Sequence, residues 1–352
     1  METVKIGVVG CGNVSEMYFE NIPTLFNEIE IIGICDLFAE KAEIAAKKYG
    51  IQKVFSSVDE LVASPEVDIV LNLTIPGEHY AVSLKAIRAG KHVYSEKPLA
   101  ATLEEGRKLI AAAQENSVRI GCAPDTFLGA GIQTCRKLID DGFIGTPVGA
   151  SAFMVCRGHE SWHPAPEFYY AAGGGPMMDM GPYYLTALVN LLGGVSSVSG
   201  MSKISFPERI ITSEPKKGEV IHVEAPTYIT GMMRFQNGAA GTIFTTFDVH
   251  KAQLPYIEIY GSEGTLSVPD PNTFSGSVTL YRPENNQFTD MPLLFDCAEN
   301  SRGIGLADMA RAIQTNRAHK ANGDMALHVL EIMESFIVSS ESGAHMEIQS
   351  RV

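Results

Sequence analysis

Short apolar runs alternate with amphipathic segments through the first third of the chain. This alternation is typical of βαβ units, so it predicts a parallel sheet flanked by helices, the doubly wound α/β arrangement of a Rossmann domain. Ser57 and Thr102 each precede a glutamate by three residues, as in the capping box that begins a helix. The strands are expected at Val4–Val9, Ile29–Cys35, Ile69–Leu73, His92–Tyr94 and Val118–Cys122.

After about residue 150 the pattern changes to β-rich segments, which predict an α+β domain with a large, mainly antiparallel open sheet. Asn237-Gly238 lies between two of these segments and suits a tight hairpin, because both residues tolerate positive φ. A helical pattern covers Asp324–Val338. We expect one domain over residues 1–124 and a second over 125–352. The β-rich segments are Val148–Arg157, Thr227–Phe235, Gly241–Val249 and Tyr256–Tyr260.

The first expected strand runs directly into Gly10-Cys11-Gly12-Asn13-Val14-Ser15, and a helix is expected to follow over Met17–Phe26. This order of strand, glycine-rich turn and helix is the dinucleotide-binding fingerprint. Gly10 permits the tight turn, and Gly12 lets the backbone approach a pyrophosphate. Free N–H groups at the start of the helix favour an anion there, so Gly10, Gly12, Asn13 and Val14 are expected to bind the cofactor.

Asp36 closes the second expected strand, at the place where an acidic residue binds the adenosine ribose hydroxyls. A carboxylate accepts hydrogen bonds from the 2′-hydroxyl of NAD but repels the 2′-phosphate of NADP. Leu37 and Phe38, which follow, supply no compensating cation. We therefore expect NAD as the cofactor, with NADP less favoured.

Length and charge narrow the class of protein further. A chain of 352 residues is long enough for two hydrophobic cores. Its net charge of −14, without a basic cluster, argues against nucleic acid and anionic membrane surfaces as partners. No apolar run reaches the ~20 residues that cross a bilayer, and the start of the chain lacks a signal-peptide pattern. Six scattered cysteines without a Cys-x-x-Cys pair indicate reduced thiols and no zinc site, so we expect a cytoplasmic protein.

Two sequence blocks give a family resemblance. The segment from Ala89 to Ala100, which contains Glu96-Lys97-Pro98, resembles the signature of the glucose-fructose oxidoreductase / inositol dehydrogenase / MocA family. Gly173–Tyr183 is similar to that family's Gly-Gly-Gly-x-x-x-Asp-x-Gly-x-His block, and the resemblance extends to the segment 329–343. It implies an NAD(P)-dependent dehydrogenase acting on a secondary alcohol of a sugar, polyol or related small molecule. It also implies that the second domain binds the substrate and that the chain forms a homodimer or homotetramer through this domain.

The resemblance assigns roles in the first domain. It places Lys97 beside the nicotinamide, in contact with the reacting hydroxyl, while Glu96 and Pro98 shape the turn. Lys97 also follows an expected strand, and open α/β sheets bind ligands at the carboxyl ends of their strands. The segment Thr74–His79 resembles the family's loop over the cofactor, which makes Thr74, Pro76, His79 and Glu96 expected cofactor contacts alongside Lys97.

In the second domain, the resemblance makes Asp179 a residue that orients the proton carrier or binds substrate. Tyr183 stands where the family usually has histidine, and we expect it to relay the proton. If residues 179–183 form a first helical turn, which Pro182 would tolerate, the two side chains face the same way. Trp162 and His163 lie in a loop of aromatic and polar residues and are expected to bind substrate together with Asp179, Tyr183 and Lys97. His159 of the same loop has no assigned role, and no third ligand at suitable spacing indicates a metal.

Two other classes of function remain open at this point. A glycoside hydrolase similar to this family could use tightly held NAD for transient oxidation and would form no net NADH. A non-catalytic redox sensor could bind the dinucleotide and signal through a partner, although the retained Glu-Lys-Pro block at residues 96–98 speaks against it.

Overall fold

The computed structural model describes residues 3–352, which form two compact units. The first unit contains the residues up to Leu128 together with Asn300–Leu330, and the second contains Gly129–Glu299 and Glu331–Val352. The sequence placed the segment 300–330 in the second domain, whereas its packing joins it to the first unit. No helix in the described part of the chain is long and apolar enough to cross a membrane.

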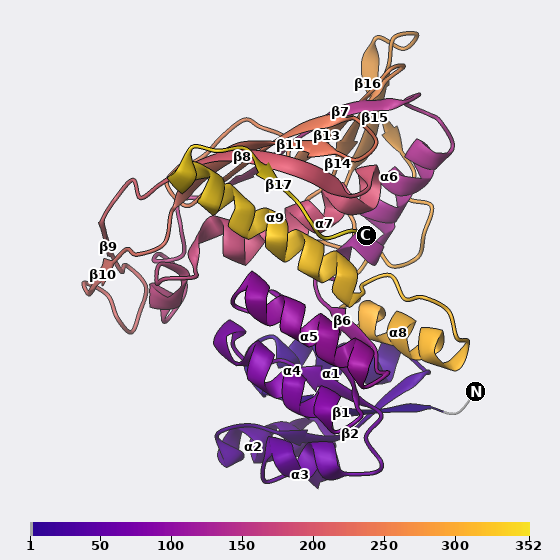
Figure 1. The fold of residues 1–352 in the computed structure, drawn as a ribbon, viewed down its shortest axis with the longest axis vertical. Helices are drawn as coiled ribbons and strands as arrows, with labels where there is room; N and C mark the ends of the chain where they lie inside the picture. Colours follow the sequence, from indigo (N-terminus) through magenta and orange to yellow (C-terminus); the bar gives the residue numbers. More distant parts are fainter. Residues whose placement is uncertain (1–2) are drawn as a thin grey trace. The chain divides into compact units, whose positions relative to one another are not determined.

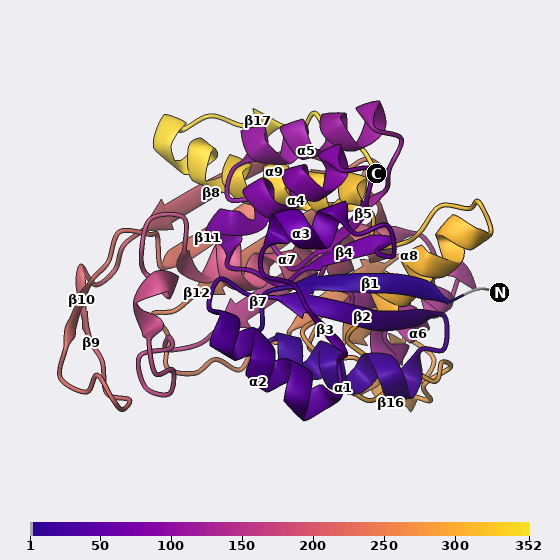
Figure 2. The same cartoon turned by 90° about the horizontal axis from the view of Figure 1, so that it is seen from below.

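A parallel sheet with helices on both faces forms the first unit, as predicted, and it has a sixth strand, β3 (Lys53–Val54), that the sequence did not predict (Figures 1 and 2). Its order is β3-β2-β1-β4-β5-β6, the doubly wound order whose switch point lies between β1 and β4. Every expected strand is confirmed to within two residues. The strands are β1 (Val4–Val9), β2 (Ile29–Cys35), β3 (Lys53–Val54), β4 (Ile69–Asn72), β5 (His92–Ser95) and β6 (Ile120–Cys122).

The helices of this unit cover both faces of the sheet. In Figure 2, α3, α4 and α5 lie above β1 and β2, and α1 and α2 lie below them. The predicted N-caps are confirmed, since Ser57 Oγ accepts the Glu60 N–H and Thr102 Oγ1 accepts the Glu105 N–H, each at 3.2 Å. The helices are α1 (Ser15–Leu25), α2 (Ala39–Tyr49), α3 (Val58–Ala63), α4 (His79–Arg88), α5 (Leu103–Glu115) and α8 (Ile304–Gln314), with short 3-10 helices η1 (Pro76–Glu78) and η2 (Thr126–Leu128).

A buried carboxylate explains why α8 belongs to the first unit. Asp125 is fully buried, and its Oδ2 accepts the N–H groups of Gly303 at 2.9 Å and Gly305 at 3.1 Å. These N–H groups stand at the start of α8, where a negative charge is favoured. Burial raises the pKa of Asp125, while the nearby Arg302 guanidinium acts in the opposite direction. No sequence pattern predicts this contact, because the residues that make it lie far apart in the chain.

The second unit is built on a nine-stranded sheet in the order β16-β15-β14-β13-β7-β12-β11-β8-β17. It is mainly antiparallel, as predicted, with one parallel pair between β7 and β12. The small hairpin β9–β10 projects from it (Figure 1). The strands are β7 (Pro147–Val155), β8 (Val195–Lys203), β9 (Glu208–Ile210), β10 (Val220–His222), β11 (Tyr228–Phe235), β12 (Ala240–Thr246), β13 (Ile257–Gly261), β14 (Thr265–Val268), β15 (Val278–Arg282), β16 (Gln287–Met291) and β17 (Met346–Glu347).

Two local predictions in this unit need correction. The Asn237-Gly238 hairpin forms between β11 and β12, but only Gly238 has positive φ, because the loop is a turn closed by Gly238 N–H to Phe235 O followed by a bulge. The helix that carries Asp179 begins at Gly175, so Pro182 lies inside it and not in its first turn. The helices are α6 (Ala130–Asp140), α7 (Gly175–Leu192) and α9 (Gly323–Ser342), with the 3-10 helix η3 (Pro166–Tyr169); the part of α9 up to Leu330 belongs to the first unit.

A pair of glycines lets α9 approach the sheet. Gly200 on β8 and Gly231 on β11 are directly opposite each other, and the fully buried ring of Phe336 lies over both. A Cβ at Gly231 would lie 2.4 Å from Phe336 Cε1, and one at Gly200 would lie 2.6 Å from the Phe336 carbonyl oxygen. Side chains at these positions would force helix and sheet apart, so the two glycines set their spacing.

We therefore predict that Gly231→Ala lowers the free energy of unfolding by about 1–3 kcal/mol, the usual cost of overpacking a core. Gly77→Ala is the matched control, because a Cβ there meets nothing within 4 Å. Denaturant titration followed by circular dichroism measures both. Adding Phe336→Leu to Gly231→Ala should recover part of the loss. Equal stability of Gly231→Ala and the control would contradict this packing account.

Candidate functional site

The carboxyl ends of four parallel strands lie along one edge of the first unit's sheet. Val9 pairs in register with Cys35 and Asn72, and Asn72 pairs with Ser95. The next segment of each strand therefore starts at the same level, at the edge where open α/β sheets bind ligands. These segments carry most of the residues that the sequence assigned to the cofactor.

The turn after β1 fits a dinucleotide pyrophosphate. Gly10 has φ of +100°, and a Cβ there would lie 2.7 Å from the Leu73 carbonyl oxygen, so only glycine fits. A Cβ at Gly12 would meet nothing within 4 Å, and Gly12 and Asn13 are exposed, which leaves the approach open. At Val14, the N-cap of α1, the side chain makes no capping hydrogen bond. The first N–H groups of this helix are thus suited to an anion.

Asp36 follows β2 and is joined to that turn. Its Oδ2 accepts the Cys11 N–H at 2.7 Å and its Oδ1 accepts the Phe38 N–H at 2.9 Å, so the carboxylate is fixed in orientation. Burial and the Asp36 charge raise the pKa of the Cys11 thiol to about 12, which keeps that thiol neutral. One cation near this segment was not predicted from the sequence: Lys41, whose Nζ lies 5.1 Å from the Phe38 ring centroid.

Asn72 and His79 hold the loop after β4. The Asn72 side-chain oxygen accepts the Thr74 hydroxyl at 2.6 Å, and its amide nitrogen donates to the His79 carbonyl oxygen at 3.1 Å. Pro76 begins η1 on the exposed side of the loop. The His79 ring is fully buried and supports the loop from within.

The two ring nitrogens of His79 face two carbonyl oxygens, Nδ1 that of Pro98 at 2.6 Å and Nε2 that of Thr74 at 2.9 Å. Only a doubly protonated ring donates to both. Burial lowers the pKa of His79, while the two carbonyls and Glu96 act to raise it. Whatever its charge, the ring joins the loop after β4 to the Glu-Lys-Pro turn after β5.

A buried glutamate fixes the turn that carries Lys97. Glu96 is 6% exposed, and its two oxygens accept the Tyr18 hydroxyl and the Lys97 backbone N–H, both at 3.0 Å. Tyr18 belongs to α1, the helix that follows the glycine-rich turn. The pair thus ties the cofactor helix to the lysine turn, and Lys97 itself is partly exposed beyond β5. The role of Tyr18 was not predicted from the sequence, because its neighbours in the chain do not distinguish it from an aromatic residue of the core.

In the second unit, α7 and the loop after β7 bring Asp179 and His159 together. His159 Nε2 lies 3.3 Å from Asp179 Oδ2, and the two side chains are 11% and 20% exposed. Tyr183 follows Asp179 by one helical turn and is only 6% exposed. The sequence predicted the Asp179–Tyr183 spacing, but it gave no sign that His159 would meet Asp179.

The predicted substrate loop is a cluster of aromatic rings. The His159 ring centroid lies 5.2 Å from that of Trp162 and 4.1 Å from that of Tyr169, and His163 lies 5.3 Å from Trp162. Trp162 is 60% exposed, so its ring is open to a ligand. Burial lowers the pKa of His163, which favours a neutral ring. The structure therefore does group Trp162 and His163, as the sequence suggested.

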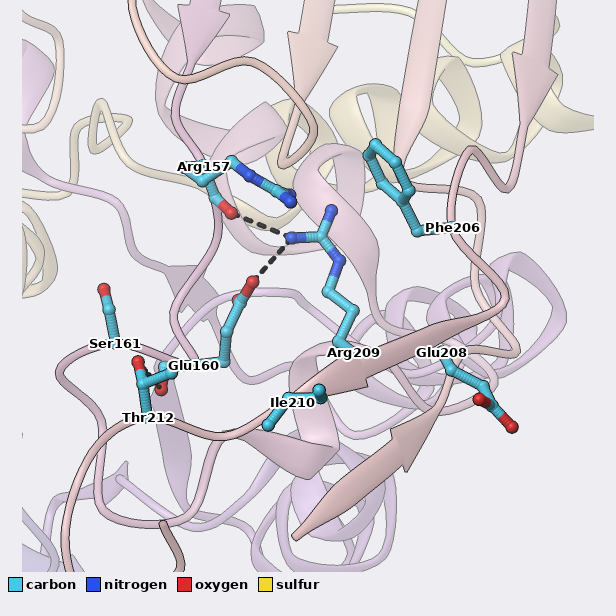
Figure 3. A pocket seen from close by; sticks show the side chains of 8 residues that line it. All are labelled: Arg157, Glu160, Ser161, Phe206, Glu208, Arg209, Ile210 and Thr212. Atoms are coloured by element: carbon cyan, nitrogen blue, oxygen red, sulfur yellow. Dashed lines mark hydrogen bonds and ion pairs between the residues drawn. The ribbon is translucent and has the colours of Figure 1, made fainter. Parts of the chain in front are cut away.

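An arginine network holds this loop in place (Figure 3). The buried Arg209 on β9 donates to Glu160 Oε1 at 2.7 Å and to the Arg157 carbonyl oxygen at 2.8 Å, and it pairs with Asp248. Tyr170 donates its hydroxyl to Glu160 as well. Arg157, Glu160 and Arg209 line a pocket of about 380 Å³ together with other residues of the loop and of β9. Because both carboxylates bond the same buried guanidinium, we assign the three side chains the role of fixing the loop.

Family models match both parts of the chain. The model described as "Oxidoreductase family, NAD-binding Rossmann fold" matches residues 4–123. The model described as "GFO/IDH/MocA C-terminal domain" matches residues 132–267. The two matches follow each other in the order of the two predicted domains.

Individual proteins resemble the chain over nearly its whole length. It is 29% identical to 1,5-anhydro-D-fructose reductase of Ensifer adhaerens over 334 residues, 91% of this chain and 92% of that protein. It is 21% identical to D-glucoside 3-dehydrogenase of Escherichia coli K12, covering 98% of this chain and 97% of that protein.

Solved structures share the fold. An NAD-binding oxidoreductase from Klebsiella pneumoniae superimposes with a TM-score of 0.87 at 23% identity, covering 99% of this chain and all of that one. Levoglucosan dehydrogenase in complex with NADH and L-sorbose gives 0.84 at 19% identity, with 99% of each chain covered. The chain therefore belongs to the glucose-fructose oxidoreductase / inositol dehydrogenase / MocA (GFO/IDH/MocA) family of NAD-binding oxidoreductases.

Proposed function

We propose that this chain transfers a hydride reversibly between a nicotinamide cofactor, preferably NAD, and a secondary alcohol carbon of a sugar or polyol. The observation that carries the proposal is the position of Lys97, held by Glu96 at the edge where Gly10, Gly12 and Asp36 form a dinucleotide-binding turn. Lys97 follows β5, which is the neighbour of β4 at the switch point of the sheet. A cation at this place is suited to stabilise negative charge on a reacting oxygen.

The chain's residues have three tasks in this proposal. The first N–H groups of α1 hold the pyrophosphate, and Asp36 holds the adenosine ribose. Lys97 stabilises negative charge on the alcohol oxygen as its proton leaves. Trp162 and His163 bind the substrate, since an exposed indole offers an apolar face to a sugar ring. The nicotinamide, when bound, supplies the hydride chemistry.

The names of the relatives support a carbohydrate substrate. Those proteins are a reductase of 1,5-anhydro-D-fructose and a dehydrogenase of D-glucosides, and the levoglucosan dehydrogenase structure contains L-sorbose. We extend that class, but none of those individual substrates, to this chain.

A spectrophotometric panel of sugars, polyols and anhydro-sugars with NAD tests the proposal. Net NADH formation with at least one substrate supports it. Glycoside cleavage without net NADH would favour the hydrolase alternative. Binding of NADH without turnover of any substrate or glycoside would favour the sensor.

We also propose that the chain forms a homodimer or homotetramer through the face of the large sheet opposite Gly200 and Gly231. The next residues along β8 and β11 point to this face, and of these Met201 is 73% and Met232 63% exposed. Exposed methionines on a broad sheet suit burial against a second copy. The free thiols of all six cysteines accord with a reducing compartment, and we place the protein in the cytoplasm.

The cofactor preference follows from the fixed carboxylate of Asp36. We expect the wild type to use NAD with higher kcat/KM than NADP. Asp36→Asn keeps an acceptor for only one of the two backbone N–H groups and removes the charge, so it should shift the ratio toward NADP by about tenfold or more, which corresponds to about 1.4 kcal/mol. Asp59→Asn, on exposed α3, is the control. If the ratio of kcat/KM for NAD and NADP is unchanged in Asp36→Asn, another residue determines the choice of cofactor, and Lys41 is the first to examine.

Replacing Lys97 should slow the reaction without weakening the binding of the cofactor. We predict that Lys97→Met lowers kcat by about two orders of magnitude or more, the cost of losing a charge-stabilising group, while NADH affinity stays near wild type. Lys85→Met removes an equivalent cation from α4, outside the strand edge, and serves as the control. Fluorescence titration of NADH and steady-state kinetics measure the two quantities. Normal turnover in Lys97→Met would exclude the lysine from the reaction.

Charges on the outer face of the large sheet should disrupt assembly. We expect sedimentation velocity to show a dimer or tetramer for the wild type and a smaller species for Met201→Glu/Met232→Glu, because the new carboxylates would lose hydration at the interface. Ile44→Glu on α2, where Ile44 is 61% exposed, is the control. A monomeric wild type, or a double variant that still assembles fully, would show that this face is not the interface.

A further inference from the structure

The family's usual proton carrier is absent from α7, where Tyr183 occupies the histidine position. Another histidine lies beside the same helix. His159, twenty residues before Asp179 in the chain, places Nε2 3.3 Å from Asp179 Oδ2. A histidine and a carboxylate within contact distance form an acid–base pair, whichever element supplies the imidazole.

The protein fixes the His159 ring on several sides. Its backbone N–H donates to the Tyr170 hydroxyl at 3.1 Å, and the Phe247 ring centroid lies 4.6 Å from that of the imidazole. Trp162 and Tyr169 cover further parts of the ring. This packing holds the imidazole in one orientation toward Asp179, as an acid–base group requires.

The titratable groups around His159 come from three segments. Its own loop supplies Glu160 and His163, and η3 with the residue after it supplies Tyr169 and Tyr170. Helix α7 supplies Asp179. Phe247, which follows β12, carries no charge. Because the Glu160 carboxylate already bonds Arg209 and Tyr170, Asp179 is the carboxylate that pairs with the imidazole.

The geometry lets a proton reach the imidazole only through the Asp179 carboxylate. The Nδ1 atom is buried and has no hydrogen-bonding partner among residues 3–352, whereas Nε2 faces the partly exposed Asp179. Tyr183 is the alternative carrier, but its side chain is almost fully buried.

We propose that the His159–Asp179 pair accepts and returns the hydroxyl proton of the substrate, replacing the histidine that α7 lacks. This inference rests on the proposed function and names the proton carrier of that site. In alcohol oxidation the O–H bond breaks, its proton passes to the pair, and the carbon's hydride passes to NAD, which leaves a ketone, NADH and a protonated pair. The pair then releases its proton to water.

The test compares two near-isosteric variants, His159→Gln and Tyr183→Phe. A glutamine can still donate a hydrogen bond to Asp179 but cannot hold a proton, so it preserves a positioning role and removes an acid–base role. We expect His159→Gln to lower kcat for alcohol oxidation by about 10²-fold to 10⁴-fold and to abolish the acid limb of its pH profile. Tyr183→Phe should keep that limb. His222→Gln removes an exposed histidine that pairs with Glu208, and it is the matched control.

Two further measurements guard against a folding defect. His159→Ala should regain part of its rate when free imidazole is added, because an external base can carry the proton. Without cofactor, ¹⁵N-histidine NMR of the wild type and of Asp179→Asn should show a difference between the two proteins in the pH dependence of the His159 signals and none in that of the His222 signals. Failure of both the rescue and the titration change would overturn the proposal.

The outcomes also separate this inference from the proposed function. A wild type that reduces NAD with a polyol while His159→Gln keeps the wild-type rate and pH profile overturns the pair alone. If Tyr183→Phe loses the acid limb of the pH profile of kcat while His159→Gln keeps the wild-type profile, Tyr183 is the proton carrier. A wild type that oxidises nothing in the panel overturns both proposals.

Discussion

The hydrogen bond between the Tyr18 hydroxyl and the buried Glu96 carboxylate joins two segments of the first unit, α1 and the Glu-Lys-Pro turn, to which we assign cofactor binding and hydride transfer. Glu96 receives a second bond from the Lys97 N–H, so one carboxylate connects the helix after the glycine-rich turn with the turn that carries the lysine. A buried charge is costly unless it is well bonded, so losing either bond would destabilise the turn. His79 makes a parallel connection between the loop after β4 and Pro98.

The second unit uses the same kind of construction around Asp179. Arg209, with its partners Glu160 and Asp248, holds the loop after β7 against the hairpin β9–β10 and the end of β12. That loop in turn presents His159 to Asp179 and leaves Trp162 exposed. In both units, therefore, a buried ionic or polar network lies behind the residues assigned to the reaction. Such networks fix orientation more than they add stability.

Local patterns were sufficient to predict the fold, because strand and helix periodicities and N-caps depend on neighbours in the sequence. The strands around Gly10 and Asp36 and the caps at Ser57 and Thr102 are examples. Contacts between distant segments were not predictable in this way. Tyr18 and Glu96 are 78 positions apart, and Asp125 meets Gly303 across 178. The His159–Asp179 pair was missed for the same reason, since no spacing rule relates a loop histidine to a helical carboxylate.

The most direct test of the account is to follow the hydrogen on the reacting carbon. A substrate carrying deuterium on its carbinol carbon is oxidised with unlabelled NAD, and the NADH formed is examined by NMR. The account predicts one deuterium at C4 of the nicotinamide ring, on one face only, together with a slower hydride-transfer step than for the unlabelled substrate. Release of the deuterium to water, or its return to the sugar without accumulation of NADH, would contradict net hydride transfer.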